Sequence, residues 1–258
     1  MPGGGTMRIT VLGSGSAYSD ISRFNSCYYV EAGDEKFLID CGSDAMRAMQ
    51  KAGIDFMTFR EIFITHMHAD HAAGLPAVLT AMHVQERKEP LEVYVPYTQV
   101  EFVSLWFANM FIYNERMSFD ISLIPLNPGL LKLRGDVALE FAPTRHLVKY
   151  SKYAATFGIE LISYSVTVRE RGKKFFFSSD LASLEEANGN LDGDISFLEA
   201  THPPLQEVAA LSLKKGSSVY FTHIPQELEE NGIWREELAS KFGIEELNRV
   251  RDGQVIDL

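Results

Sequence analysis

Short apolar stretches bounded by glycine and polar residues run through the whole chain and predict β-strands. The first alternates apolar and polar positions over residues 8–12, before a glycine-containing turn. Strands are expected over residues 8–12, 26–31, 36–40, 61–65, 91–95, 137–141, 159–168, 174–177, 195–198 and 218–221. Apolar residues at helical spacing predict helices over residues 43–52, 71–87, 98–117, 204–214 and 234–241. Strands and helices alternate in both halves, which indicates an α/β fold of packed layers.

No feature of the sequence divides the chain into parts. The 258 residues contain no linker rich in Pro, Gly or Ser, no block of like charges and no repeat of fixed period. Hydrophobic residues make up 46% of the chain, which is enough for a sizeable core. We therefore expect a single domain over residues 1–258.

Membrane association and secretion are not expected. The longest apolar runs fall well short of the roughly 18 residues that a membrane span needs. Residues 1–7 lack the basic start and apolar stretch of a signal peptide. Cys27 and Cys41 are too few for a disulfide framework, so the cytoplasm is the expected compartment.

The formal net charge of −11 bears on the kind of partner. Proteins that bind long nucleic acids carry basic patches, because their affinity grows with the number of phosphates that Lys and Arg neutralise. An acidic chain therefore argues against an extended nucleic-acid partner. It is compatible with a small phosphorylated substrate that is held through metal ions.

The strongest chemical signal is a cluster of four metal-binding side chains within six residues. The apolar run 61–65 leads directly into His66, His68, Asp70 and His71. Imidazole nitrogen and carboxylate oxygen suit zinc and its first-row neighbours. A loop lets His66 and His68 point one way while Asp70 and His71 turn towards a second ion, so the segment predicts a metal site.

Four side chains from one loop do not fill two coordination spheres, so further ligands are expected at the ends of other strands. His146, Asp180 and His223 each follow an apolar strand closely, and Thr222-His223 repeats the pattern of Thr65-His66. Ligand sites in α/β sheets gather at the carboxyl ends of strands. The alternative is that these three are ordinary turn residues.

Two further histidines are less clear. His83 lies among apolar residues a helix length beyond the cluster, which favours a structural role. His202 follows the strand 195–198 and precedes Pro203-Pro204, so it is expected near the site without being assigned as a ligand. A catalytic or substrate-facing role and a purely structural role both stay open for His202.

At these residues the sequence resembles the metallo-β-lactamase superfamily, and within it the ribonuclease Z-like branch. The resemblance covers almost the whole chain and rests on the segments Leu12–Ser16, Arg23–Cys27, Leu38–Gly42, Thr65–His71, His146, Ser179-Asp180, Leu198–Thr201 and Thr222-His223. It implies a four-layer αββα sandwich, in which two sheets pack face to face and helices lie outside.

The resemblance also implies how the ligands are shared between two divalent ions. Zinc is the expected metal, with manganese and iron as alternatives. One ion is assigned to His66, His68 and His146, the other to Asp70, His71 and His223, and Asp180 bridges both. Asp40 is expected behind the ligands, where its carboxylate orients a ligand imidazole.

The sequence departs from ribonuclease Z in two ways. Leu198 stands where that family has a histidine before Glu-Ala-Thr, and no basic, Gly/Pro-rich insertion is available to form an arm that grips tRNA. With the acidic net charge, these departures make a tRNA 3′-processing endonuclease the least favoured of the hydrolase alternatives.

Two metal ions about 3.5–4 Å apart can stabilise both the attacking and the leaving oxygen of a displacement reaction. They also lower the pKa of bound water to roughly 7. We therefore expect a phosphodiesterase that cleaves a small or cyclic phosphodiester with a metal-bound hydroxide, which Asp70 helps to position. His202 and Glu199 are the candidates for protonating the leaving group. Arg145, Lys149 and Tyr150 are the expected substrate contacts, through phosphate and base stacking.

Several rival readings stay open. A hydrolase of the same fold could act instead on a lactone, thioester or other carbonyl compound. A di-iron oxidoreductase would have a carboxylate at the position of His68, and a non-catalytic binding protein would have lost a ligand. The aromatic segment 98–117 is expected to form either a lid or the contact of a homodimer, since Trp, Tyr and Phe favour interfaces.

Overall fold

Two β-sheets form the centre of the computed structural model, which describes residues 7–215, 218–229 and 231–258. The first sheet has the strand order β13-β1-β2-β3-β4-β5-β6. Its strands are β1 (Arg8–Gly13), β2 (Cys27–Ala32), β3 (Glu35–Ile39), β4 (Glu61–Phe63), β5 (Leu91–Pro96), β6 (Ile121–Leu126) and β13 (Val255–Asp257). The pairs from β3 to β6 are parallel, whereas β13, β1, β2 and β3 pair in antiparallel fashion.

The second sheet has the order β12-β11-β10-β9-β8-β7. It consists of β7 (Gly129–Lys132), β8 (Val137–Pro143), β9 (Tyr164–Glu170), β10 (Lys173–Phe177), β11 (Ile195–Glu199) and β12 (Val219–Thr222). Strands β10, β11 and β12 are parallel to one another.

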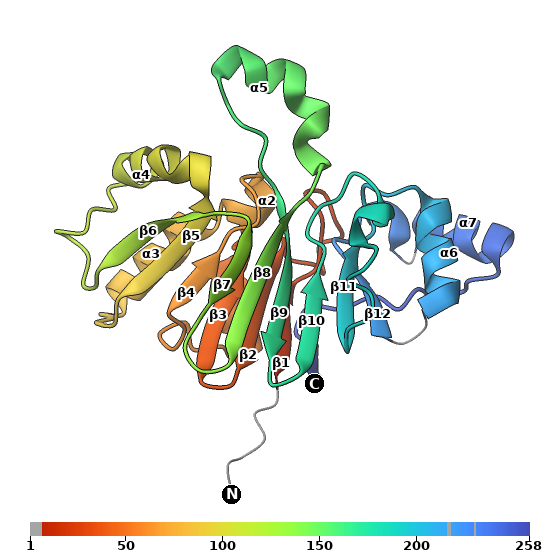
Figure 1. Ribbon diagram of the computed structural model, residues 1–258, viewed down its shortest axis with the longest axis horizontal. Coiled ribbons are helices and arrows are strands. Elements are labelled where there is room, and N and C mark those ends of the chain that lie inside the picture. The colour runs from red at the N-terminus through yellow and green to blue at the C-terminus, as the bar shows by residue number, and fades with distance from the viewer. Residues whose placement is uncertain (1–6, 216–217, 230) are drawn as a thin grey trace, which may run out of the picture.

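Each sheet is covered on its outer face by helices (Figure 1). The first carries α1 (Ala45–Ala52), α3 (Leu75–Val84) and α4 (Val100–Asn109), and the second carries α6 (Leu205–Lys215) and α7 (Ile233–Phe242). The helices α2 (Ala69–Ala72) and α5 (Ser151–Phe157) lie at one end of the sheets.

The alternation of side chains along the strands divides the core into three layers of apolar contact. In β3, Leu38 packs towards the helices of the first sheet, whereas Phe37 and Ile39 pack between the two sheets. A third cluster joins β10, β11 and β12 to α6 and α7. This follows from the two-residue period of a strand and confirms the predicted αββα sandwich.

The predicted helix 71–87 is wrong in its extent. It is split into α2 and α3, because Gly74 lies against the backbone of Gly42: a Cβ atom at Gly74 would be 2.1 Å from the Gly42 carbonyl oxygen. The Gly74 amide donates to the Cys41 carbonyl at 2.9 Å. The split holds the loop of residues 66–71 against the end of β3.

The helix predicted over 98–117 ends at Asn109, after which the chain turns. The strand predicted over 159–168 begins only at Tyr164. Residues 159–163 form no strand, and a 3₁₀ turn and α5 occupy residues 146–157. Edge strands β6, β7 and β13 were not expected. The burial patterns of β6 and β7 do not alternate, and β13 has only three residues, so no clear hydrophobic pattern marks these strands in the sequence.

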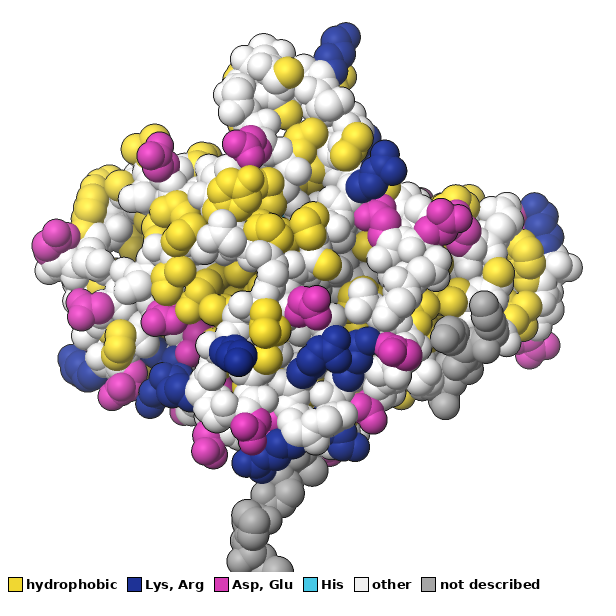
Figure 2. All heavy atoms as spheres, viewed as in Figure 1, with side chains coloured by type: hydrophobic (Ala, Val, Ile, Leu, Met, Phe, Trp, Pro, Cys, Tyr) yellow, Lys and Arg dark blue, Asp and Glu magenta, His cyan; other side chains and the backbone are white. Residues whose placement is uncertain are grey.

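Hydrophobic side chains are exposed along α4 and just after it, at Phe102, Leu105, Met110 and Phe111. Figure 2 shows hydrophobic side chains gathered over the side of the molecule that carries α4. The expectation of a lid or a homodimer contact at this segment stays a prediction. No helix among the described residues is long and apolar enough to cross a bilayer.

Candidate metal centre and active site

Seven side chains that could hold a metal ion meet where the strands of both sheets end. They come from the loop after β4, from α2 and from the segments after β8, β10 and β12: His66, His68, Asp70, His71, His146, Asp180 and His223. The carboxyl ends of these strands lie at the same end of the sandwich, which brings distant parts of the sequence together.

The first group consists of His66, His68, His146 and Asp180. Nδ1 of His68 lies 3.0 Å from Nε2 of His66 and 3.1 Å from Nε2 of His146. Oδ2 of Asp180 lies 3.4 Å from Nε2 of His146 and 3.7 Å from Nε2 of His66. Four donor atoms therefore surround one point.

The second group consists of Asp70, His71 and His223, together with the other oxygen of Asp180. Nε2 of His223 lies 3.1 Å from Oδ2 of Asp70 and 3.4 Å from Nε2 of His71. Oδ1 of Asp180 lies 3.2 Å from Nε2 of His71 and 3.5 Å from Nε2 of His223. Asp180 thus presents one oxygen to each group.

The donor set of both groups fits a divalent cation. Ligand atoms about 2.0–2.1 Å from a tetrahedral zinc ion lie roughly 3.4 Å from one another, close to the spacings found here. Oδ1 of Asp180 is buried and accepts no hydrogen bond from the described residues. Nor does any Lys or Arg among those residues pair with Asp70 or Asp180, whose ion partners are all histidines.

The two groups differ in the protonation of their histidines. Burial lowers the pKa of His146 to about 4 and that of His66 well below its usual value, so their nitrogens carry free lone pairs at neutral pH. Burial also acts on His223, but the charge of Asp180, the hydrogen bond to Asp70 and the nearby Glu199 carboxylate outweigh it and raise the pKa to about 10. A cation that binds the second group must therefore displace a proton.

Asp40 stands behind His71, as expected for a carboxylate that orients a ligand. Nδ1 of His71 donates to Oδ2 of Asp40 at 2.6 Å, which leaves Nε2 of His71 facing Asp180. The amide and hydroxyl of Thr65 donate to Oδ1 of Asp40, both at 2.9 Å, and the Ser26 hydroxyl donates to Oδ2 at 3.1 Å. Asp40 is fully buried, and these four donors stabilise its charge in place of water.

A family model described as "Anti-Pycsar protein Apyc1" matches residues 7–240. The chain belongs to this family. A curated relative also confirms the predicted resemblance to the ribonuclease Z-like branch. Ribonuclease Z of Methanothermobacter thermautotrophicus is 34% identical over 142 residues, which are 55% of this chain and 45% of that relative. The chain thus matches about half the length of its curated ribonuclease relatives.

Solved structures of low sequence identity share the fold. The metallo-β-lactamase fold protein YhfI from Bacillus subtilis superposes with a TM-score of 0.74 at 18% identity, covering 99% of this chain and 100% of that one. A diphosphatase of the PhnP family gives 0.66 at 19% identity, covering 98% of each chain. Yeast PDE1 gives 0.65 at 14% identity, covering 99% of this chain and 100% of that one. The predicted class of enzyme, a metal-dependent hydrolase of this fold, agrees with the family and its ribonuclease relatives.

In this member of the Apyc1 family, His202 and Glu199 form a pair beside Asp180. Nδ1 of His202 donates to Oε2 of Glu199 at 2.8 Å, and the His202 amide donates to the same oxygen at 3.0 Å. Glu199 is fully buried and its other oxygen accepts from the Leu181 amide. His202 is partly exposed, so of the two candidates for protonating the leaving group only His202 reaches the open side of the centre.

Two cavities open on either side of His202. One, of about 410 Å³, is lined by Arg145, Lys149 and His146. The other, of about 500 Å³, is lined by Tyr150 and Tyr18 and, from the metal centre, by Asp70, Asp180 and His223. The Tyr150 ring stands edge-on to His68 with centroids 5.5 Å apart. All three predicted substrate contacts thus border the centre, while their roles stay predictions.

Sequence reasoning missed the hydroxyl network that connects the two sheets below the metal centre. The Thr65 hydroxyl, which donates to Asp40, lies 2.8 Å from the Ser179 hydroxyl beside Asp180. A second such contact joins the Thr222 hydroxyl of β12 to the Tyr28 hydroxyl of β2 at 2.5 Å. The threonine that precedes a histidine in both Thr65-His66 and Thr222-His223 was the available sequence signal for these hydroxyl contacts. His83 lies away from the centre, where it accepts a hydrogen bond from the Ser118 amide at 3.0 Å.

Replacing Asp40 with Asn tests whether the Asp40 carboxylate orients His71 for metal binding. An amide can donate to Nδ1 of His71, which favours the tautomer that carries its proton on Nε2 and blocks metal binding there. We expect zinc affinity to fall by about 10–100-fold, measured by competition with a chromogenic chelator. The control Asp34→Asn, at an exposed position in the turn between β2 and β3, should leave the affinity unchanged. Equal affinity in Asp40→Asn and the wild type would show that the contact does not orient His71.

Proposed function

We propose that this protein is a dinuclear metal-dependent phosphodiesterase that cleaves a small or cyclic phosphodiester, with zinc as its expected metal. The observation that carries the proposal is the position of Asp180, whose two carboxylate oxygens face two separate groups of ligands. One carboxylate between two such groups suits a site that holds two cations close together.

Bound in these groups, two divalent ions would supply Lewis-acid activation of water and of the phosphoryl oxygens. The chain itself would hold and orient the reactants. Burial works against ionisation of Asp70, but the hydrogen bond from His223 and the charges of His71 and His223 lower its pKa to about 2. Asp70 therefore stays ionised and can accept a hydrogen bond from the attacking water.

The leaving oxygen needs a proton, and His202 is the residue best placed to give it. Glu199 accepts the hydrogen bond from Nδ1, so it fixes the ring and favours a proton on that nitrogen. Nδ1 of His202 also lies 3.6 Å from Oδ2 of Asp180, so two carboxylates face this nitrogen and hold the ring beside the centre. Glu199 is then a positioning residue and His202 the acid.

The residues that line the two cavities beside His202 support a phosphorylated substrate of modest size. Arg145 and Lys149 place two cations on one side of His202, where an anionic ester can bind. Tyr150 and Tyr18 place two aromatic rings on the other side, where a base can stack. The Apyc1 family match and the shared fold with a PhnP-family diphosphatase point the same way.

A panel of substrates tests the reaction class on zinc-loaded protein. We expect hydrolysis of bis-p-nitrophenyl phosphate and of at least one 3′,5′-cyclic nucleotide, and loss of both activities in Asp180→Ala. A lactone, a thioester and a precursor tRNA serve as the competing substrates. Turnover of a lactone or thioester without phosphodiesterase activity would overturn the proposal in favour of carbonyl chemistry, and cleavage confined to the tRNA would favour 3′ processing.

The role of His202 is tested by comparing leaving groups. We expect His202→Gln to lower kcat on a cyclic nucleotide by about 10²–10⁴-fold, because its alkoxide leaving group needs a proton. The same variant should hydrolyse bis-p-nitrophenyl phosphate almost normally, since nitrophenolate leaves without one. His83→Gln, which removes a histidine far from the centre, is the matched control. Equal losses on both substrates would contradict the assignment of His202 as the acid.

A further inference from the structure

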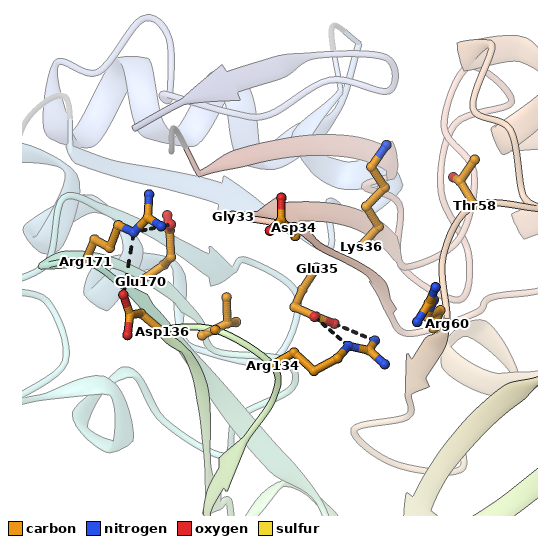
Figure 3. Close-up of a pocket in the computed structure, with 12 residues that line it drawn as sticks. Gly33, Asp34, Glu35, Lys36, Thr58, Arg60, Arg134, Asp136, Glu170 and Arg171 are labelled. Atoms are coloured by element: carbon orange, nitrogen blue, oxygen red, sulfur yellow. Dashed lines mark hydrogen bonds and ion pairs between the residues drawn. The ribbon is translucent and has the colours of Figure 1, made fainter. Parts of the chain in front are cut away.

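A further cavity, of about 510 Å³, lies at the end of the sandwich opposite the metal centre. It is lined by the turns that connect β2 to β3, β7 to β8 and β9 to β10, and by the residues before β4 (Figure 3). Both sheets contribute to it, and nothing in the proposed reaction uses it.

Glu170, the last residue of β9, carries a buried carboxylate that lines this cavity. Its exposed fraction is 1%, and neither carboxylate oxygen accepts a hydrogen bond from any described residue. The nearest cation is Arg171, whose Nε lies 3.7 Å from Oε1, beyond hydrogen-bond distance. A buried carboxylate without donors is costly, so Glu170 is suited to a ligand that brings N–H groups.

A free cation lies across the cavity from Glu170. The guanidinium of Arg60 forms no hydrogen bond or ion pair with the residues that the structure describes, and Figure 3 shows Arg60 and Glu170 on opposite sides of the cavity. Arg134, between them, is already engaged: its Nε and Nη2 each donate to the Glu35 carboxylate at 2.8 Å, and Nη2 also donates to Glu61 at 3.0 Å. The cavity is therefore bordered by a buried carboxylate that accepts no hydrogen bond and by an exposed guanidinium that is unpaired among the described residues.

We propose that this cavity binds a small zwitterion, with an ammonium group at Glu170 and a carboxylate or phosphate at Arg60. A bare metal ion is not the occupant that the geometry favours. The groupings of His, Cys, Asp and Glu close enough to hold a metal, among the described residues, all lie at the metal centre described above.

Binding would connect the two sheets. Glu170 belongs to the second sheet, whereas Arg60 directly precedes β4 of the first, so a ligand held at both ends spans the gap between them. A ligand that binds only the folded chain also raises its unfolding temperature. The expected signature is therefore binding together with thermal stabilisation, independent of the reaction at the metal centre.

The test uses the zinc-loaded full chain and a series of ω-amino acids: glycine, 4-aminobutanoate and 6-aminohexanoate. Hexylamine and hexanoate supply the cation and the anion separately. We expect one ω-amino acid to bind by calorimetry and to raise the melting temperature, with an affinity at least about tenfold above that of either single-charge probe. Absence of binding by all three at millimolar concentration, or equal binding by hexylamine, overturns the proposal.

Two variants assign the ends of the ligand. Glu170→Gln keeps the shape of the side chain and should weaken the ω-amino acid about tenfold or more, because the ammonium loses its charged partner. Arg60→Gln, at an exposed position where misfolding is not expected, should weaken the ω-amino acid and hexanoate but not hexylamine. Binding that neither variant changes would place the ligand elsewhere and refute the assignment. Phosphodiesterase activity should be unaffected in both variants.

Discussion

The buried carboxylate of Asp180 is the feature on which the rest of the site depends. It lies between two groups of histidines, and its charge is offset by no Lys or Arg among the described residues. Burial raises the free energy of the ionised form, yet the charges of His223 and His71 hold the pKa of Asp180 well below its usual value. Such an arrangement is stable only when positive charge is supplied, by protonated histidines or by cations.

The fold brings this charge arrangement about through the ends of its strands. Three non-glycine residues next to the centre, Asp40, Ser179 and His223, have left-handed backbone conformations with φ of 61°, 48° and 51°. Such conformations cost free energy and persist where the surroundings fix them. Here the hydrogen bonds around Asp40 and Thr65 and the packing of the two sheets fix them, so the centre is largely formed by the protein before any cation binds.

Much of the site could be predicted because its residues follow apolar strands directly. The pattern of strand, threonine and histidine located His66 and His223, and the runs before Asp180 and His146 placed both at strand ends. The pairing of His202 with Glu199 was not predicted, since it depends on how the chain turns after β11. The Ser179 hydroxyl and the cavity at Glu170 could not be predicted, because both arise where the two sheets meet and neither sheet alone determines them.

In the fold, the central strands were predicted well because burial on both faces leaves continuous apolar runs. The edge strands β6, β7 and β13 and the helix α5 were missed. Leu130 in β7 and Tyr153 in α5 are largely exposed, so no hydrophobic pattern marks these elements. The break at Gly74 also escaped, since only the approach of Gly42 requires it.

The central claim is that Asp180 joins two cation sites into one centre, and metal stoichiometry measured by native mass spectrometry tests it most directly. The account predicts two zinc ions per chain in the wild type. It predicts that His146→Gln loses the first ion preferentially and Asp70→Asn the second, whereas Asp180→Asn weakens both. A single zinc ion in the wild type, or an Asp180→Asn variant that loses only one ion and keeps the other at full affinity, would contradict the account.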